Sequence, residues 1–287
     1  MTIHRFEVGR LRCAVVSDHE KGVLAWPWQM YFGPDTGVDD GEVERALEEE
    51  GEIRPQPLIG YNCIAVDTGQ RRLVVDTGLG REFTGYGERS TTLGRLVGGL
   101  EEAGMPADSV DTVVFTHLHN DHTRGAVWAG RPTFPGADHV VNTAEAAFWE
   151  SELDDRPGHR GVPLSARYTL QVAGPTVRRI EFDTDIAPGV RAISAAGHTP
   201  GHMAVLLSSE GERLLCLGDT FYDRIQLRRP DWWTRFDVDG PASIAARRRL
   251  LAWAADEDIP VTVYHMPFPG LGRIRRAGAA YDWMEGI

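Results

Sequence analysis

The chain has 287 residues, of which 42% are aliphatic, aromatic or Cys and 25% are charged, the composition of a globular protein with a substantial core. Its formal net charge of −12 disfavours a nucleic-acid partner, because phosphate binding requires a basic face. No run of about 18 apolar residues occurs, and the N-terminus lacks the apolar core and cleavage site of a signal peptide, so we expect a cytoplasmic protein that does not associate with a membrane.

In the first third of the chain, apolar runs alternate with polar turns. Residues 11–18 form an apolar run that predicts an opening strand. Residues 25–37 are aromatic and irregular, and residues 39–52 have the spacing of a short acidic helix. Residues 62–80 predict a hairpin, because two β-branched runs each end in Asp-Thr-Gly and are joined by a turn containing glycine. Residues 91–104 have helical spacing and end at a glycine, which predicts a helix.

Farther along the chain, short apolar strands with polar ends recur. They are predicted at residues 111–116, 139–143, 190–196, 213–219 and 261–265, with helices at 143–153 and 241–258. Hairpins mixed with helices favour a layered α/β sandwich over a doubly wound sheet with strict alternation. No repeat, low-complexity tract or long linker divides the chain, so we expect one domain over residues 1–287.

The chain contains three cysteines, Cys13, Cys63 and Cys216. They are widely spaced and lie in apolar segments such as RLLCLGD. An odd number without a CxxC pair predicts small buried thiols and neither a disulfide framework nor a cysteine metal site.

Four metal-capable side chains are crowded into the stretch THLHNDHTRG, residues 116–125, namely His117, His119, Asp121 and His122. A single histidine in a polar loop is usually solvated, but three histidines and an aspartate at this spacing favour a metal site. His117 follows a predicted strand, and three more candidates follow strands in the same way: His198, Asp219 and His265. Such placement is expected when strand ends converge at one edge of a sheet and carry functional loops.

The spacing within the motif has a direct physical meaning. In extended backbone, residues two apart point to the same side, so His117 and His119 can bind one ion together. A turn at Asn120 can direct Asp121 and His122 toward a second ion. Imidazole nitrogens and carboxylate oxygens are suitable zinc ligands, and a mixed set without cysteine favours a catalytic ion over a closed structural one.

Four motifs span nearly the whole chain. They are T-H-x-H-x-D-H at 116–122, GHTPGH at 197–202, LGD at 217–219 and the late His265. In these motifs, which occur in the order typical of that family, the chain resembles the metallo-β-lactamase superfamily. The resemblance implies an αββα sandwich, an α/β fold in which two mixed β-sheets are flanked by helices. It also implies two divalent ions, most suitably Zn²⁺, with Mn²⁺, Fe²⁺ or Co²⁺ admissible. His117, His119 and His198 would hold the first ion and Asp121, His122 and His265 the second, with Asp219 bridging.

The resemblance also suggests residues around the ligands. Asp76 matches a position that orients the site from behind the ligands, although a turn aspartate would give the same sequence. His202 is similar to another supporting residue, with a loop histidine bonded to backbone as the alternative. Many relatives have x-Gly-Gly after Asp-His, whereas Arg124 stands here between Thr and Gly, either exposed on a helix turn or reaching the mouth of the site. No role is assigned to the remaining histidines, His4, His19, His139 and His159.

Two ions about 3.5–4 Å apart can share a water and lower its pKa toward neutrality, which provides a metal-bridging hydroxide to attack a carbonyl. The ions also polarise that carbonyl and stabilise the charge that develops on it. We therefore expect a hydrolase of a small ester or lactone. Asp121 either serves only as a ligand or also relays a proton to the leaving group. Tyr222 is similar to a tyrosine of acyl-homoserine-lactone lactonases that hydrogen-bonds the substrate carbonyl, with a tyrosine packed in its loop as the alternative.

Other functions fit parts of the pattern. Residues 265–276, with 229–251 before them, resemble the branch that contains methyl parathion hydrolase, which suggests an organophosphate triesterase. A specialised acyl hydrolase of secondary metabolism is a further alternative. A mononuclear-iron sulfur dioxygenase is disfavoured because Asp121, His122 and His265 complete a second ion site. A binding protein that has lost its metals is disfavoured because all seven ligand positions are intact.

Aromatic side chains cluster in loops and beside the ligand segments. An apolar cleft with a few polar groups would suit a small acyl or aryl substrate. We expect Phe221 and Phe268, which neighbour predicted ligands, to line this cleft. Trp26 and Trp28 are expected to pack in the core or against a partner subunit. The aromatic segment 26–32 and the family resemblance also suggest a homodimer.

Overall fold

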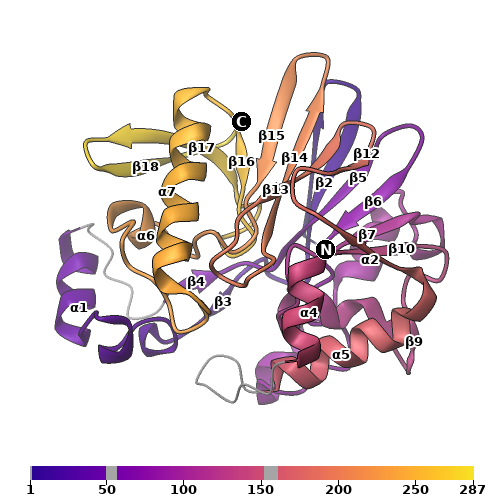
Figure 1. The fold of residues 1–287 in the computed structure, drawn as a ribbon, viewed down its shortest axis with the longest axis horizontal. Helices are drawn as coiled ribbons and strands as arrows, with labels where there is room; N and C mark the ends of the chain where they lie inside the picture. Colours follow the sequence, from indigo (N-terminus) through magenta and orange to yellow (C-terminus); the bar gives the residue numbers. More distant parts are fainter. Residues whose placement is uncertain (1, 50–56, 152–160) are drawn as a thin grey trace.

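Two β-sheets pack face to face in the computed structural model, which describes residues 2–49, 57–151 and 161–287 (Figure 1). The first sheet has seven strands in the spatial order β1 (Ile3–Val8), β2 (Leu11–Ser17), β5 (Asn62–Asp67), β6 (Arg72–Val75), β7 (Thr112–Val114), β10 (Asp138–Asn142) and β11 (Val177–Ile180). The second has seven in the order β12 (Asp185–Ala187), β13 (Val190–Ser194), β14 (Met203–Ser209), β15 (Glu212–Cys216), β16 (Val261–Thr262), β17 (Leu271–Ala277) and β18 (Ala280–Glu285). Two-stranded ribbons are formed by β3 (Leu24–Ala25) with β4 (Leu58–Ile59) and by β8 (Val127–Trp128) with β9 (Arg131–Pro132).

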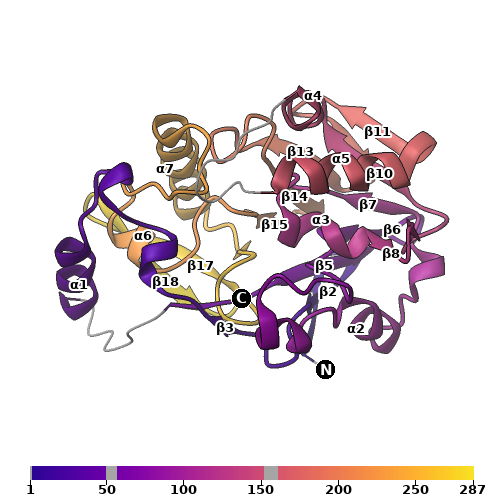
Figure 2. The same cartoon turned by 90° about the horizontal axis from the view of Figure 1, so that it is seen from below.

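Helices cover the outer faces of both sheets, so the predicted αββα sandwich is confirmed. The second sheet is covered by α7 (Gly240–Asp256), and the first by α2 (Leu96–Glu102), α4 (Thr143–Ser151) and α5 (Val162–Ala173) (Figures 1 and 2). Shorter helices are α3 (Asn120–Thr123) and α6 (Ile225–Arg228), and α1 (Asp40–Glu49) lies at the end of the molecule near α6. Short 3-10 helices occur at Trp28–Met30, Pro34–Thr36, Gly87–Thr92, Ala107–Ser109, Arg124–Ala126 and Gly174–Thr176.

Apolar side chains fill one layer between the sheets and one layer on each outer side. Along β5, Ile64 and Val66 face the second sheet, whereas Cys63 and Ala65 face the helices of the first. This is the period-2 alternation of a strand that is buried on both faces. The three layers make a rigid scaffold from which the loops at the sheet edges project.

The direction of the strands decides where the polar strand ends lie. In the first sheet β6, β7 and β10 run parallel to one another. In the second sheet β15 and β16 are parallel, and β13 has the same direction because two antiparallel pairings separate it from β15. Since the carboxyl ends of parallel strands meet at one edge, the segments that follow these strands are brought together.

Several sequence-based boundaries differ from the structure. The helix predicted over 91–104 is interrupted at Gly94, whose φ of 74° is left-handed, so only α2 is an α-helix there. β1 precedes the predicted opening strand and is not apparent in the sequence, because several of its side chains are exposed. The last predicted strand, 261–265, is reduced to the two residues of β16. The predicted helix ends, residues 50–52 and 152–153, lie outside the described residues.

The three cysteines are buried and free, as predicted. Within residues 2–49, 57–151 and 161–287, no helix is both long and apolar enough to cross a membrane. The extent of a single domain over residues 1–287 stays a prediction.

One buried carboxylate, that of Asp18, connects three elements of the first half. It follows β2, and its Oδ1 accepts a hydrogen bond from the Leu96 N–H at the start of α2, at 3.0 Å. Its Oδ2 accepts hydrogen bonds from the N–H groups of Leu79 at 2.9 Å and Gly80 at 3.3 Å, in the loop after β6. Asp18 therefore satisfies backbone donors that neither α2 nor that loop can satisfy locally.

We predict that Asp18→Ala lowers the free energy of unfolding by about 3 kcal/mol or more, because each buried donor left unsatisfied costs about 1–3 kcal/mol. Denaturant unfolding followed by circular dichroism measures the change. Asp108→Ala, at an exposed position in a 3-10 turn, is the matched control and should have little effect. A loss below about 1 kcal/mol for Asp18→Ala would contradict the assigned role.

Candidate metal centre

The seven predicted ligands lie together at the edge shared by the two sheets. The loop after β7 and helix α3 supply His117, His119, Asp121 and His122, whereas the segments after β13, β15 and β16 supply His198, Asp219 and His265. The ligand atoms form two groups, within each of which they lie no more than 4.8 Å apart: His117, His119, His198 with Asp219, and Asp121, His122 with His265. The structure thus unites the predicted residues, while the binding of ions to them stays a prediction.

Three imidazole nitrogens face one another in the first group. His117 Nε2 lies 3.0 Å from His119 Nδ1 and 3.2 Å from His198 Nε2. His119 Nδ1 and His198 Nε2 are 3.0 Å apart. All three side chains are buried. Three imidazole nitrogens directed toward a common centre are an arrangement suited to a zinc ion.

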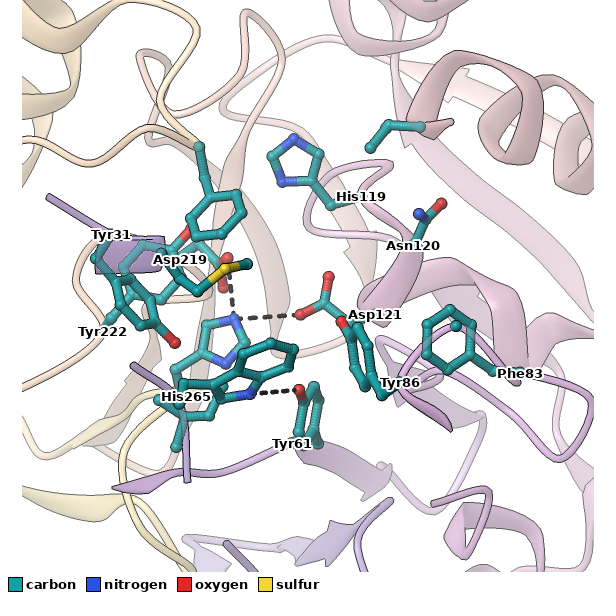
Figure 3. Close-up of a pocket in the computed structure, with 16 residues that line it drawn as sticks. Tyr31, Tyr61, Phe83, Tyr86, His119, Asn120, Asp121, Asp219, Tyr222 and His265 are labelled. Atoms are coloured by element: carbon teal, nitrogen blue, oxygen red, sulfur yellow. Dashed lines mark hydrogen bonds and ion pairs between the residues drawn. The ribbon is translucent and has the colours of Figure 1, made fainter. Parts of the chain in front are cut away.

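Asp219, which belongs to the first group, also contacts histidines of the second group. Its Oδ2 is 3.5 Å from His198 Nε2 and 3.2 Å from His265 Nε2. Its Oδ1 is 3.1 Å from His122 Nε2. Asp121 completes the second group with its Oδ2 3.4 Å from His265 Nε2, as the dashed lines around His265 show in Figure 3. One carboxylate therefore contacts histidines of both groups, which is the geometry of a bridging ligand.

Three ligand histidines have a hydrogen-bond partner on the ring nitrogen that faces away from the centre. His122 Nδ1 is 2.8 Å from Asp76 Oδ2, and His198 Nδ1 is 2.9 Å from Asp237 Oδ1. His265 Nδ1 donates to the Gly60 carbonyl at 3.1 Å. Such contacts fix the tautomer and orientation of a ligating imidazole.

Two of these partners differ in how visible they are in the sequence. Asp76 was expected to orient the site, and it also accepts the Thr116 N–H at 2.8 Å. Asp237 is missed by sequence reasoning, because nothing in RFDVDG distinguishes it from Asp239, which caps α7. Its only signal is its tertiary contact with His198.

His202 combines both of the roles weighed for it. Its Nδ1 donates to the backbone carbonyl of Ala195 at 3.2 Å, and its Nε2 accepts the Asp219 N–H at 3.2 Å. Burial lowers the pKa of His202 to about 3, so the ring is neutral and can act as donor and acceptor at once. His202 therefore holds the loop that carries Asp219.

The electrostatics of the site fit divalent cations. Burial opposes the charge of Asp219, but His122 and His265 hold the pKa of this carboxyl well below its usual range. Burial, with the positive charge of His122, holds the pKa of His117 well below its usual value, so His117 presents a lone pair. His122 Nε2 and Asp219 Oδ1 are buried 3.1 Å apart, and among the described residues neither atom has a further hydrogen-bond partner. A cation between them would satisfy both atoms, so the residues fit the ions that the family resemblance implies.

A cleft of about 370 Å³ opens onto this centre. His119, Asp121, Asp219 and His265 line it on the side of the metal centre (Figure 3). Its other walls are mainly aromatic, formed by Trp26, Tyr31, Tyr61, Phe83, Tyr86 and Phe236. The Trp26 indole N–H donates to the Tyr61 hydroxyl at 3.2 Å, which ties two of these walls together. The predicted apolar cleft with few polar groups is present.

Tyr222 lines the same cleft beside the ligands. Its hydroxyl lies 3.5 Å from His198 Nε2, and its ring stacks on His265 with centroids 4.7 Å apart and an interplanar angle of 15°. Burial and the nearby Asp219 carboxylate raise the pKa of Tyr222 well above its usual value. The phenol therefore keeps its proton and can donate a hydrogen bond into the cleft.

The expectation for two phenylalanines was wrong. Phe221 and Phe268 are not among the residues that line the cleft: Phe221 is buried in the layer under α7, and Phe268 packs against the layer between the sheets. Tyr222 occupies the cleft side of the loop and leaves the core side to Phe221. Trp28 is buried in the core, as expected, whereas Trp26 lines the cleft.

Arg124 supports the cleft wall without lining the cleft. Its guanidinium lies over the Phe83 ring, 5.5 Å from the centroid. One of its nitrogens lies 3.5 Å from Ser165 Oγ on α5. Arg124 is thus partly exposed at the end of α3 and connects the motif to an aromatic side chain of the cleft.

The other histidines have structural partners outside the site. His19 Nε2 lies 2.8 Å from Thr92 Oγ1, and His139 Nδ1 lies 2.9 Å from Thr176 Oγ1. His4 is exposed, and His159 lies outside the described residues.

The profile of the metallo-β-lactamase superfamily matches residues 56–257, which is more than half of the chain. The chain belongs to the metallo-β-lactamase superfamily. This membership agrees with the order of the ligand motifs and with the two-sheet architecture. Together with the relatives described next, it confirms the predicted resemblance and the predicted enzyme class, a metal-dependent hydrolase.

The sequence is similar to those of several named proteins. An N-acyl homoserine lactonase from Bacillus sp is 25% identical over 199 residues, which are 63% of this chain and 71% of the relative. The lactamase-like protein nscB from Aspergillus fumigatus is 30% identical over 188 residues, 65% of this chain and 44% of the relative. An atrochrysone carboxyl ACP thioesterase from Passalora fulva is 26% identical over 162 residues, 56% of this chain and 38% of the relative. The matched regions thus span less than half the length of the last two proteins.

Solved structures of the superfamily resemble the whole chain. AidC, a dizinc quorum-quenching lactonase solved in complex with a product, has a TM-score of 0.88 and 21% identity, covering 100% of this chain and 98% of AidC. The hydrolase AbOPH has a TM-score of 0.83 and 24% identity, covering 99% of this chain and 97% of AbOPH. At these identities the likeness shows the fold.

We predict that Asp237→Asn lowers the affinity for zinc at the first group of ligands about 10–100-fold, because the charged acceptor of the His198 Nδ1–H is lost. Competition with a chromogenic chelator measures the affinity. Asp231→Asn, which alters an exposed pair with Arg248, is the control and should leave zinc affinity unchanged. Equal affinities for the two variants would remove Asp237 from the site.

Proposed function

We propose that this superfamily member is a dinuclear metal-dependent hydrolase of a small ester or lactone. In this proposal His117, His119 and His198 hold one divalent ion, Asp121, His122 and His265 hold the other, and Asp219 bridges them, with zinc as the most suitable metal. The observation that supports it most directly is the placement of Asp219, whose two oxygens contact His122 on one side and His198 and His265 on the other. Bound there, the ions would supply an activated water and polarise the substrate carbonyl.

The residues of the chain orient the substrate for this reaction. Tyr222, protonated and beside His198, donates a hydrogen bond to the substrate carbonyl oxygen and to the charge that develops on it. Asp121, which is partly exposed to the cleft, would take up the proton that the attacking hydroxide releases and give it to the leaving alkoxide. The aromatic walls exclude water from the acyl or aryl part of the substrate.

The cleft favours an uncharged substrate. Among the described residues that line it, none is Lys or Arg, whereas two are the carboxylates Asp121 and Asp219. The proposed ions would compensate these two carboxylates, but an anionic substituent against the aromatic walls, away from the ions, would find no Lys or Arg among the described lining residues to compensate its charge. A lactone or ester with an apolar arm matches these walls, and the N-acyl homoserine lactonases among the relatives act within this chemistry.

A second candidate is hydrolysis of an acyl thioester in secondary metabolism. It is favoured by the relative named as an ACP thioesterase, and the carbonyl chemistry at the centre would be the same. An organophosphate triesterase is a third candidate, suggested by the C-terminal segment 265–276, and it would use the same ions on a phosphoryl oxygen.

We predict that the zinc-loaded protein hydrolyses acyl-homoserine lactones, simple γ- or δ-lactones or p-nitrophenyl esters faster than an acyl thioester or an aryl dialkyl phosphate. Chelator treatment should abolish the activity, zinc should restore it, and His198→Ala should lack it. The panel is measured by kcat/KM for each substrate. Preference for the thioester or the phosphate would replace the proposal by that candidate, and inactivity of zinc-loaded protein on the whole panel would contradict it.

We predict that Tyr222→Phe lowers kcat about 100–1000-fold with unchanged metal content, because one hydrogen bond to the developing oxyanion is lost. The measurement is steady-state kinetics on the best substrate together with metal analysis. Tyr168→Phe, at an exposed position on α5, is the matched control. An unchanged kcat would leave Tyr222 with a packing role alone.

A further inference from the structure

A buried glutamate on α4 contacts both of the loops that carry the first group of ligands. Glu145 lies in the first turn of α4, and its side chain is fully buried. Its Oε1 accepts the Leu118 N–H at 2.8 Å and the Trp149 indole N–H at 2.7 Å. Its Oε2 accepts the Thr199 hydroxyl at 2.5 Å and the Gly201 N–H at 3.0 Å. Four donors therefore converge on one carboxylate.

Two of these donors belong to residues that directly adjoin predicted ligands. Leu118 stands between His117 and His119, in the loop after β7 of the first sheet. Thr199 directly follows His198, in the loop after β13 of the second sheet. Glu145 thus joins the two loops whose histidine nitrogens must meet at one ion, although it is itself no part of either ligand group.

The loop that carries Gly201 packs tightly against the start of α4. A Cβ atom on Gly201 would lie 2.3 Å from the Glu145 backbone nitrogen and 2.5 Å from its Cβ, so only glycine permits this approach of the loop to α4. Trp149, which shares Oε1 with Leu118, lies with its ring centroid 5.5 Å from that of His119. The carboxylate, the tryptophan and the glycine together fix the distance between the loops.

The bonding pattern requires a carboxylate and not merely a polar side chain. Both oxygens accept two hydrogen bonds each, and three of the four donors are N–H groups that cannot reverse their direction. A glutamine in the same place would direct its amide NH₂ either at the Leu118 and Trp149 N–H groups or at the Gly201 N–H. In both orientations at least one buried donor faces another donor, which is unfavourable.

We propose that Glu145 is a positioning residue that holds the His119 loop and the His198 loop at the separation required to bind the first ion. This inference rests on the proposed metal site and is independent of the proposed substrate. It implies that the first group loses metal affinity when Glu145 is altered. We expect Asp121, His122 and His265 to keep theirs, because the bonds of Glu145 to the two loops end at Leu118, Thr199 and Gly201, beside His117, His119 and His198, whereas Asp121 and His122 lie on α3 and His265 follows β16.

The test is zinc binding to Glu145→Gln, measured on folded protein by metal analysis and chelator competition well below its melting temperature. We expect one of the two zinc ions to bind about 10–100-fold more weakly and the other to bind as before. Glu150→Gln, on the same helix but exposed and paired with Arg179, should bind both ions normally. If Glu145 only stabilised the fold, the melting temperature would fall while both affinities stayed unchanged, and that result would overturn the proposal.

A milder pair of variants covers the case in which Glu145→Gln does not fold. Thr199→Val keeps the side-chain shape and removes one donor, so zinc affinity should fall in the same direction but by a smaller factor. Thr199→Ser keeps the hydroxyl and should restore the affinity of the unaltered protein. Equal affinities for the Val and Ser variants would contradict the proposal. Failure of the unaltered protein to bind two ions would instead overturn the metal site itself, and this inference with it.

Discussion

Burial of the Asp219 carboxylate among histidines from both sheets is the interaction on which the rest of the structure depends. A buried carboxylate is unfavourable unless charges and hydrogen bonds compensate it. Here His122 from the first sheet and His265 from the second face its two oxygens, and the ring of His202 accepts its backbone N–H. The two sheets must therefore pack so that the ends of these strands lie at the same edge. The apolar layer between the sheets holds them in that arrangement.

The loops at this edge are held by polar side chains that come from elsewhere in the chain. Asp76 and Asp237 each bond the outer nitrogen of a ligand histidine, and Asp18 joins the loop after β6 to α2. Glu145 joins the loop of His119 to the loop of His198. Since loops have little intrinsic structure, these buried contacts convert a crowded set of histidines into a centre of defined geometry.

The metal centre and the cleft contribute different parts of the function. Two ions at such a centre can serve the hydrolysis of esters, lactones, thioesters or phosphate esters, and the same scaffold supports all of these in principle. Selection among substrates then depends on the walls, which here are aromatic and free of Lys and Arg among the residues described. The N-terminal segment contributes Trp26 and Tyr31 to these walls, so it belongs to the substrate cleft as well as to the core.

The sequence by itself determined the fold class and predicted which side chains come together at one edge of the sheets, because each of His117, His198, Asp219 and His265 follows a short apolar strand, and a metal motif is a local pattern. The family resemblance also pointed to Asp76 and Tyr222, each with a purely local role as the alternative. Only the tertiary structure decided which side chains support and enclose the centre. Asp237, Glu145 and Tyr61 acquire their roles from partners that are distant in the chain, as in the bonds of Glu145 to Leu118 and Thr199, and such partners leave no local pattern. For the same reason Phe221 lies in the core although it adjoins the cleft residue Tyr222: adjacency in the chain does not decide which side of a loop faces the core.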